Sequence, residues 1–185
     1  VVVKQMPDDA TWHPGDVRYS TVRWMFQPGS GYAVGPSRAN PYTGELYDAD
    51  IRISADFVRS FYREQTELIA PILGQVSMDF ESEKPTEEFS SEMCQYGDHL
   101  REEMASGWDV MTTTGVLKGT DEELQNYIHN GLVDLILHEV GHTLGLRHNF
   151  KGSSIYSIEQ LSDPKFTRKY GISGSVMDYQ PINVF

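Results

Sequence analysis

Three of the chain's six histidines lie within one short stretch, His138–His148, and a glutamate directly follows the first of them. Side chains four residues apart share one face of a helix, so His138 and His142 can direct imidazole nitrogens at one cation. Glu139 is rotated by about 100° from His138 around such a helix, which places its carboxylate beside the cation. A carboxylate in that position is suited to take a proton from a water that the cation activates.

Gly145 is placed to end the helix that carries these residues. Glycine adopts the left-handed backbone conformation without a Cβ clash, and it commonly follows the last helical turn. The turn allows the chain to bring His148 toward the same cation from a new direction. Three protein ligands and one open position are typical of a catalytic zinc site, whereas a structural zinc has four protein ligands. The stretch therefore predicts one catalytic Zn²⁺, bound by His138, His142 and His148.

A His-Glu-x-x-His segment by itself is short enough to arise by chance, and its histidines can lie on a solvated helix face. The longer pattern adds Gly145 and His148 at fixed offsets, and this extended form is the metzincin signature, paired with a methionine-containing turn downstream. Residues 175–179 place Met177 in a fitting position. A lone methionine is usually adaptable core filler. After the zinc pattern, however, we interpret Met177 as the Met-turn residue.

Residues 138–148 and 175–179 resemble the zinc-binding helix and the Met-turn of the metzincin clan of zinc metalloendopeptidases. With their flanking residues, they resemble the large bacterial Met-zincin proteases, which are matrixin-like. The resemblance implies a zinc-dependent endopeptidase that hydrolyses peptide bonds of a protein or peptide substrate, with Glu139 as general base. It also implies an exported protein, either secreted or periplasmic or on the cell surface, although no signal peptide opens the chain.

The same resemblance suggests roles for residues around the zinc. In astacins and serralysins the tyrosine two places after the Met-turn methionine lies near the zinc and helps to stabilise the reacting carbonyl. Tyr179 is a candidate for that role, the alternative being a buried aromatic beneath the site. Met177 would form an apolar floor under the histidines. In matrixin-like proteases an edge strand pairs with the substrate. The residues in the corresponding place, unless they form an ordinary connection, are Tyr32, Ala33, Val34 and Gly35.

The expected fold is mixed α+β. It has a metzincin-like twisted sheet with an antiparallel edge strand, packed on the long zinc-binding helix. A small C-terminal subdomain then carries the Met-turn. At 185 residues the chain is long enough to bury a sizeable core. We therefore expect a single catalytic core, with an N-terminal subdomain over 1–148 and a C-terminal subdomain over 149–185.

Local patterns predict the elements of this fold. The capping box at Thr120 opens the zinc helix, which is expected to reach about Leu146. Alternating apolar residues predict strands, and helical spacing predicts helices. The strands expected ahead of the zinc helix cover 19–26, 32–36 and 46–54, and the helices cover 55–73 and 92–104, with a further short helix beginning near Ser157.

The composition limits the classes of partner. The net charge of −12 argues against nucleic acid, whose phosphates need clustered Lys and Arg. No run of about 20 apolar residues exists, so no membrane span is predicted. The simplest interpretation of the acidity is a solvated surface that favours solubility. A weaker interpretation is calcium binding, although no EF-hand loop is present. The carboxylates considered for it are Asp48 and Asp50, or Asp121, Glu122 and Glu123.

The single cysteine, Cys94, cannot form a disulfide within the chain. It is interpreted as a buried thiol or as a partner for a segment outside this chain. No cysteine-switch segment of the matrixin type is recognisable, so the sequence does not support latency through a thiolate on the zinc. The remaining histidines, His13, His99 and His129, are interpreted as surface or core residues.

Three other functions are compatible with the same zinc pattern. They are a catalytically silent metzincin-fold binding module, a zinc hydrolase that acts on esters or small amides, and a toxin-like or partner-bound subunit. Glu139 beside an open zinc position favours catalysis, because a scaffold needs neither. No counterpart of the clan's first strand and long helix precedes Tyr19, and few residues follow Met177. The chain is therefore expected to be a catalytic core cut from a larger polypeptide. Nothing in the sequence indicates an oligomeric state.

Overall fold

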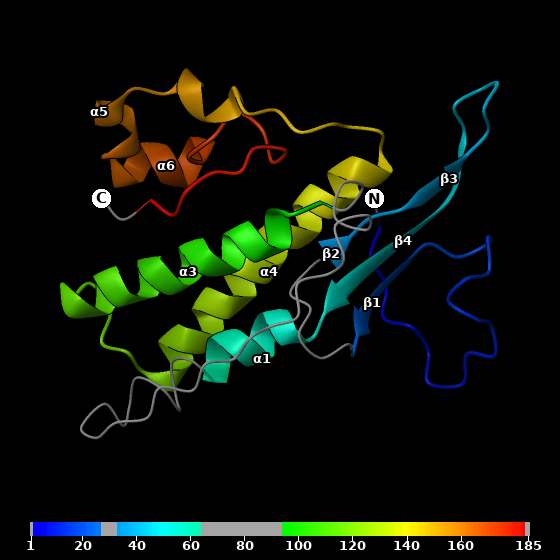
Figure 1. Ribbon diagram of the computed structural model, residues 1–185, viewed down its shortest axis with the longest axis horizontal. Coiled ribbons are helices and arrows are strands. Elements are labelled where there is room, and N and C mark those ends of the chain that lie inside the picture. The colour runs from blue at the N-terminus through cyan, green and yellow to red at the C-terminus, as the bar shows by residue number, and fades with distance from the viewer. Residues whose placement is uncertain (1, 27–32, 64–93, 184–185) are drawn as a thin grey trace.

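The computed structural model describes residues 2–26, 33–63 and 94–183. A mixed sheet lies beside a helical layer in which α3 (Tyr96–Thr113) and α4 (Asp121–Thr143) run next to each other (Figure 1). This arrangement confirms the predicted α+β fold, with a sheet packed on the long helix that carries the zinc pattern. None of the helices within the described ranges is both long and apolar enough to cross a membrane.

Strand β4 (Leu46–Ser54) is the centre of the sheet, and its bounds match the prediction. It pairs in parallel with β1 (Thr21–Met25) and antiparallel with β2 (Ala33–Val34), so the predicted antiparallel edge strand is confirmed in a shorter form. Strand β3 (Ser37–Ala39) was not predicted, because its three exposed residues show no apolar alternation. It forms because β4 is long enough to pair with both β2 and β3.

The apolar side chains of the sheet and of α1 (Asp56–Arg63) meet in one core. Ile51 and Ile53 point from β4 into this core, and Phe57 and Phe61, one helical turn apart on α1, are buried with them. The predicted helix over 55–73 is confirmed as far as Arg63, and its remainder lies outside the described residues.

Helix α3 is longer than the segment predicted over 92–104. It begins at Tyr96 and continues to Thr113 because Met104 and Trp108 extend its buried face by another turn. Gly131 of α4 lies against the Met104 side chain, where a Cβ would overlap the methionine sulfur. This absence of a side chain allows the two helices to approach closely, and it fixes α3 beside the zinc helix.

Helix α4 begins at the predicted capping box. The backbone N–H of Glu123 donates to the Thr120 hydroxyl at 3.3 Å, and the Thr120 N–H donates to the Glu123 carboxylate at 3.1 Å. The helix ends at Thr143, a little before the predicted Leu146. Leu135, one turn before the zinc pattern, is fully buried. The helix is therefore fixed at its start by capping and near its end by the core.

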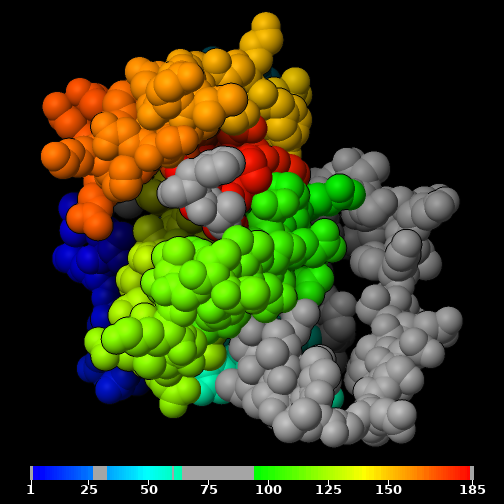
Figure 2. Space-filling model, turned by 90° about the vertical axis from the view of Figure 1, so that its left-hand side faces the viewer, coloured from blue at the N-terminus to red at the C-terminus, as the bar shows by residue number. Residues whose placement is uncertain are grey.

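The residues after the zinc pattern form three short helices, η2 (Gly152–Ile155), α5 (Ile158–Leu161) and α6 (Pro164–Tyr170). Ser157 caps α5, as predicted. Figure 2 shows these helices, in orange, across from α3, in green, with red C-terminal residues between them. The Ile182 N–H donates to the Glu103 carboxylate at 3.2 Å, which attaches this final segment to α3.

Candidate metal centre

The first two histidines of the zinc pattern lie on the last turns of α4 and are oriented by backbone carbonyls. His138 is fully buried, and its Nδ1 lies 2.7 Å from the Val176 carbonyl oxygen. His142 Nδ1 lies 3.0 Å from the Leu146 carbonyl oxygen. A carbonyl only accepts, so each Nδ1 carries the proton and each Nε2 keeps a free lone pair. Such carbonyl partners are typical of metal-binding histidines.

Gly145 ends the zinc helix in the way the sequence predicts. Its φ is 85°, in the left-handed region. The Leu146 N–H donates to the Gly141 carbonyl at 3.0 Å and the Gly145 N–H donates to the His142 carbonyl at 2.9 Å, which together form a Schellman motif. The motif also directs the Leu146 carbonyl at His142. After this turn the chain reverses and brings His148 back to the other two histidines.

Two of the three histidines meet at a spacing that fits a zinc ion, and the ligand nitrogens of all three lie within 4.8 Å of one another. Nε2 of His142 and Nε2 of His148 are 3.1 Å apart. A tetrahedral zinc with Zn–N bonds of 2.0–2.1 Å would separate two nitrogen ligands by about 3.3 Å. Burial lowers the pKa of His138 to about 4, so this ring is neutral at pH 7, as a metal ligand must be. The structure thus brings together the three predicted ligands.

Glu139 lies next to this centre as a fully buried carboxylate. Neither of its oxygens has a hydrogen-bond partner of ordinary geometry among the described residues. Burial raises the pKa of its carboxyl to about 7, and the nearby Cys94 thiol offsets part of that rise. A buried and unpaired carboxyl costs stability, so its presence calls for a chemical role. A pKa near 7 suits a group that both accepts and returns a proton at neutral pH.

Cys94 lies within the same cluster, a placement that the sequence did not predict. Its Sγ is 3.4 Å from His138 Nε2 and 3.4 Å from His148 Nε2. The ligand atoms of these residues and of His142 all lie within 4.8 Å of one another. The reason is tertiary: Cys94 lies two residues before α3, and the packing of α3 on α4 brings the thiol to residues far along the chain.

Met177 occupies the predicted place beneath the zinc helix. Only 2% of its surface is exposed, and its sulfur lies where a Cβ on Gly141 would be. The turn that holds it is fixed on both sides. The Asn149 N–H donates to the Met177 carbonyl at 2.8 Å, and the buried Asp178 carboxylate accepts the Ser153 N–H. The Met-turn therefore ties the residues after His148 to the underside of the zinc helix.

This contact predicts that Gly141→Ala destabilises the chain. The new methyl group would overlap the Met177 sulfur, and such overpacking costs about 1–3 kcal/mol in the free energy of unfolding. Urea unfolding of the single variants and of Gly141→Ala combined with Met177→Ala measures the effect. The combined variant should lose less stability than the sum of the two single losses, because the smaller residue makes room for the methyl group. Additive losses would contradict the contact.

Tyr179 lies beside the histidine cluster, where its predicted role on a substrate carbonyl would require it. Its ring centroid is 4.8 Å from that of His148, and its hydroxyl is 3.4 Å from the Cys94 sulfur. Phe150 contacts the same ring from another side, with centroids 5.3 Å apart. Burial raises the pKa of Tyr179, so its hydroxyl remains a proton donor at neutral pH.

Sequence reasoning missed other residues that support the site. The Tyr96 ring stacks on His138 with centroids 4.0 Å apart, and its hydroxyl donates to Asp134. His99 stacks on Tyr179 at 5.5 Å and so lies close to the site, whereas His13 and His129 are exposed, as predicted. Tyr96 and His99 lie on α3, and no local sequence motif indicates that they contact residues near α4.

The predicted substrate strand lies against Glu139. Ala33 and Val34 form β2, Ala33 is buried, and Tyr32 lies outside the described residues. Gly35 follows directly, and a Cβ there would lie 2.6 Å from the Glu139 backbone oxygen and 3.2 Å from its carboxylate. Only a glycine allows the chain to approach the zinc helix this closely. The segment therefore lies beside Glu139, the predicted general base. Its pairing with a substrate stays a prediction.

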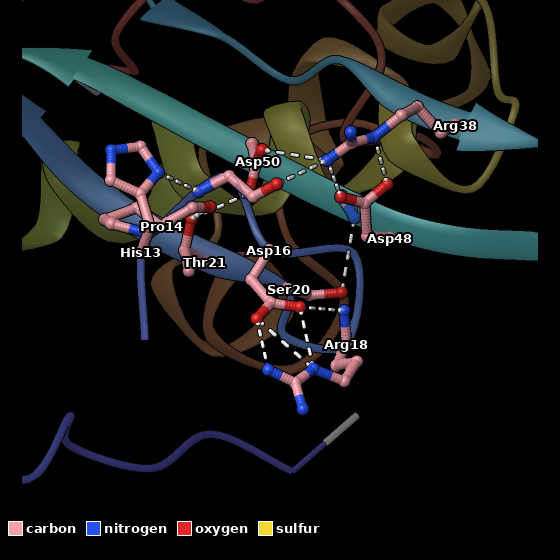
Figure 3. Close-up of polar contacts among 11 residues, drawn as sticks. His13, Pro14, Asp16, Arg18, Ser20, Thr21, Arg38, Asp48 and Asp50 are labelled. Carbon is pink, nitrogen blue, oxygen red and sulfur yellow. Dashed lines mark hydrogen bonds and ion pairs between the residues drawn. The ribbon is translucent and has the colours of Figure 1, made fainter. Parts of the chain in front are cut away.

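Three of the five carboxylates considered for calcium, Asp48, Asp50 and Glu123, have other partners. Arg38 Nε donates to Asp48 Oδ1 at 2.7 Å, and an Arg38 terminal nitrogen lies 3.7 Å from Asp50 (Figure 3). Asp50 also accepts the Thr21 hydroxyl at 2.8 Å. Calcium needs several oxygens that are not already neutralised by a guanidinium. In the second group, Glu123 serves as the helix cap. Calcium therefore gains no support at either place.

The architecture and the site together define a class. A mixed sheet beside a long helix, three histidines converging at the end of that helix, and a buried methionine turn beneath them are the features of a metzincin-like metalloprotein.

Comparison with known families supports the same class. Residues 120–185 match the model of a family described as Met-zincin, which supports a metzincin-clan family. The matched residues include the whole zinc pattern and the Met-turn, whereas the sheet and Cys94 lie outside them. No curated protein and no solved structure matches the chain. The narrower resemblance to matrixin-like proteases stays a prediction.

Proposed function

We propose that the protein is a zinc-dependent endopeptidase in which Glu139 acts as the general base. The observation that carries this proposal is a fully buried, unpartnered carboxylate directly beside three convergent imidazoles. A scaffold that only binds metal gains nothing from that carboxylate and loses stability by burying it. A hydrolase needs a base at that place.

The zinc would be held by Nε2 of His138, Nε2 of His142 and a ring nitrogen of His148. Zinc bound there supplies Lewis acidity, which lowers the pKa of water from 15.7 to roughly 7 and polarises a carbonyl. Glu139 takes a proton from the attacking water and returns it to the leaving nitrogen of the cleaved bond. Its pKa of about 7 allows both transfers near neutral pH.

The substrate would lie between β2 and the aromatic side of the site. An extended peptide can pair with an edge strand through main-chain hydrogen bonds, and Gly35 brings that edge against Glu139. On the other side, the Tyr179 hydroxyl can donate to the carbonyl oxygen as negative charge develops on it. This arrangement favours a peptide over a small ester, because the edge strand recognises the repeating backbone. Export of the protein stays an expectation.

A catalytically silent zinc module is the second candidate, and the position of Cys94 favours it. A thiolate on the zinc would complete four protein ligands, which is the arrangement of a structural site. The two candidates differ in whether peptide bonds are cleaved.

The deciding experiment combines elemental analysis with digestion of a peptide library. We expect one zinc per chain, cleavage that stops on chelation, and recovery when zinc is restored. Both the wild-type chain and Cys94→Ala are assayed, because the thiol lies at the open side of the histidines. One bound zinc without cleavage in either chain would establish the silent module instead. Cleavage of esters but not of peptides would assign a different hydrolase.

A further inference from the structure

We propose that Cys94 is a fourth protein ligand and that, with zinc bound, Cys94 and the three histidines form a closed Cys-His₃ centre. The inference rests on the proposed zinc site and adds to it a resting state that excludes water from the metal. Cys94 lies outside the family match, so nothing in the comparisons assigns it.

The spacing of the sulfur matches a shared metal. A tetrahedral zinc with a Zn–S bond of about 2.3 Å and Zn–N bonds of 2.0–2.1 Å separates sulfur from nitrogen by about 3.5–3.6 Å. The Cys94 sulfur is 3.4 Å from His138 Nε2 and 3.4 Å from His148 Nε2. The nitrogen pair of His142 and His148, at 3.1 Å, is equally close to its tetrahedral spacing. Three of the six ligand pairs thus have spacings close to those of a tetrahedral centre, and all four ligand atoms lie within 4.8 Å of one another.

The free lone pair of His138 Nε2 suits a metal ligand. Nδ1 of this ring donates its proton to the Val176 carbonyl, so Nε2 can only accept a hydrogen bond or bind a cation. The Cys94 sulfur lies 3.4 Å from this nitrogen, from His148 Nε2 and from the Tyr179 hydroxyl. A cation among them would be bound by the sulfur and both nitrogens, and the Tyr179 hydroxyl could still donate to the sulfur.

Glu139 is an independent second observation that points to a ligand here. Its carboxylate is fully buried and has no hydrogen-bond partner of ordinary geometry among the described residues. When the sulfur binds the metal, the S–H bond breaks and Glu139 or solvent takes the proton. The sulfur lone pair forms the metal–sulfur bond, and the water that held that position leaves. No electron is transferred, so the step requires no oxidant or reductant.

The consequence is a centre that is closed until Cys94 moves away. Four protein ligands leave no place for water on the metal, so Glu139 would have no activated water from which to take a proton. Withdrawal of the residue that precedes α3 would open the site that the histidines and Glu139 form. The same side chain thus separates a resting state from a catalytic one.

Cobalt in place of zinc tests the metal–sulfur bond directly. We expect a thiolate-to-cobalt charge-transfer band in the near ultraviolet for the wild-type chain, and its loss in Cys94→Ala with cobalt still bound. X-ray absorption of the zinc protein should show one sulfur at about 2.3 Å, replaced by a nitrogen or oxygen in the variant. Because Cys94 is the only cysteine, a thiolate signal has no other source.

Thiol alkylation tests the same bond without altering Cys94. Zinc should slow alkylation of the folded wild-type chain by roughly tenfold or more, and a chelator should restore the rate. The matched control is Thr113→Cys in the Cys94→Ala chain, which places a thiol on an exposed turn of α3. Alkylation of that thiol should not depend on zinc. If the closed state is favoured about tenfold, only about a tenth of the wild-type chains are open to substrate. Cys94→Ala cannot close in this way, so it should cleave peptides about tenfold faster than wild type.

The outcomes separate this inference from the proposed function. One bound metal per chain, a spectrum with nitrogen and oxygen ligands only, and alkylation that ignores zinc would overturn the role of Cys94 and leave the histidine site intact. A chain that binds no zinc at all would instead remove the proposed function.

Discussion

Glu139→Gln is expected to retain one zinc per chain and to lose roughly 10²–10⁴-fold in peptide turnover, the range that general acid–base catalysis contributes. The amide has the shape of the carboxyl, so the buried volume beside the histidines is preserved. It cannot accept a proton from water or return one to the leaving nitrogen. Turnover is measured in the wild-type and Cys94→Ala backgrounds, so that the thiol does not mask the effect. Elemental analysis of the same samples reports the zinc.

The matched control is Glu122→Gln, the same chemical change on an exposed residue at the start of α4. It should leave both zinc content and turnover unchanged. A Glu139→Gln chain that cleaves peptides at the parent rate would remove Glu139 from the proposed mechanism. A chain that loses its zinc would instead show that the carboxyl supports the metal.

His148→Ala is expected to weaken zinc binding by roughly 100-fold or more. Loss of a residue that only orients a ligand already costs 10–100-fold in metal affinity, and a ligand should cost at least as much. His148 is only half-buried, so truncation leaves the core of α4 in place. Competition with a chromophoric chelator measures the zinc affinity, and circular dichroism checks that the helix content is kept.

His129→Ala is the control for this variant, because His129 is exposed on the same helix, away from the cluster. It should bind zinc as tightly as the wild-type chain. Equal affinities for the two variants would show that the third histidine does not hold the metal, and the three-histidine site would be wrong. In that case the ligand set to examine would consist of Cys94, His138 and His142.

The residues of the zinc pattern were predictable because their geometry is local. His138 and His142 share a face through the helical repeat, and Gly145 reverses the chain through two hydrogen bonds between near neighbours. The bounds of β4 and the start of α4 were predictable for the same reason, since alternation and capping act over a few residues. Met177 could be assigned to the Met-turn only because the zinc pattern precedes it in the sequence.

Cys94, Tyr96 and His99 could not be predicted, because no local rule connects them to the histidines. The Cys94 sulfur meets His138 across 44 residues of sequence and Tyr179 across 85. The contact depends on α3 lying against α4, and that depends in turn on Gly131 leaving room for Met104. The short strand β3 was missed for a similar reason, since its pairing comes from the length of β4.

By itself, the sequence determined the three imidazoles, the neighbouring carboxylate and the turn that unites them, because these depend on the backbone geometry of one helix and its end. Only the tertiary structure decided what surrounds them: which aromatic rings support the histidines, which strand edge meets Glu139, and that a thiol lies beside the three imidazoles. The physical reason is that packing between distant segments places these groups. Side-chain volumes across the whole core set that packing, and the spacing of residues along the chain does not encode it.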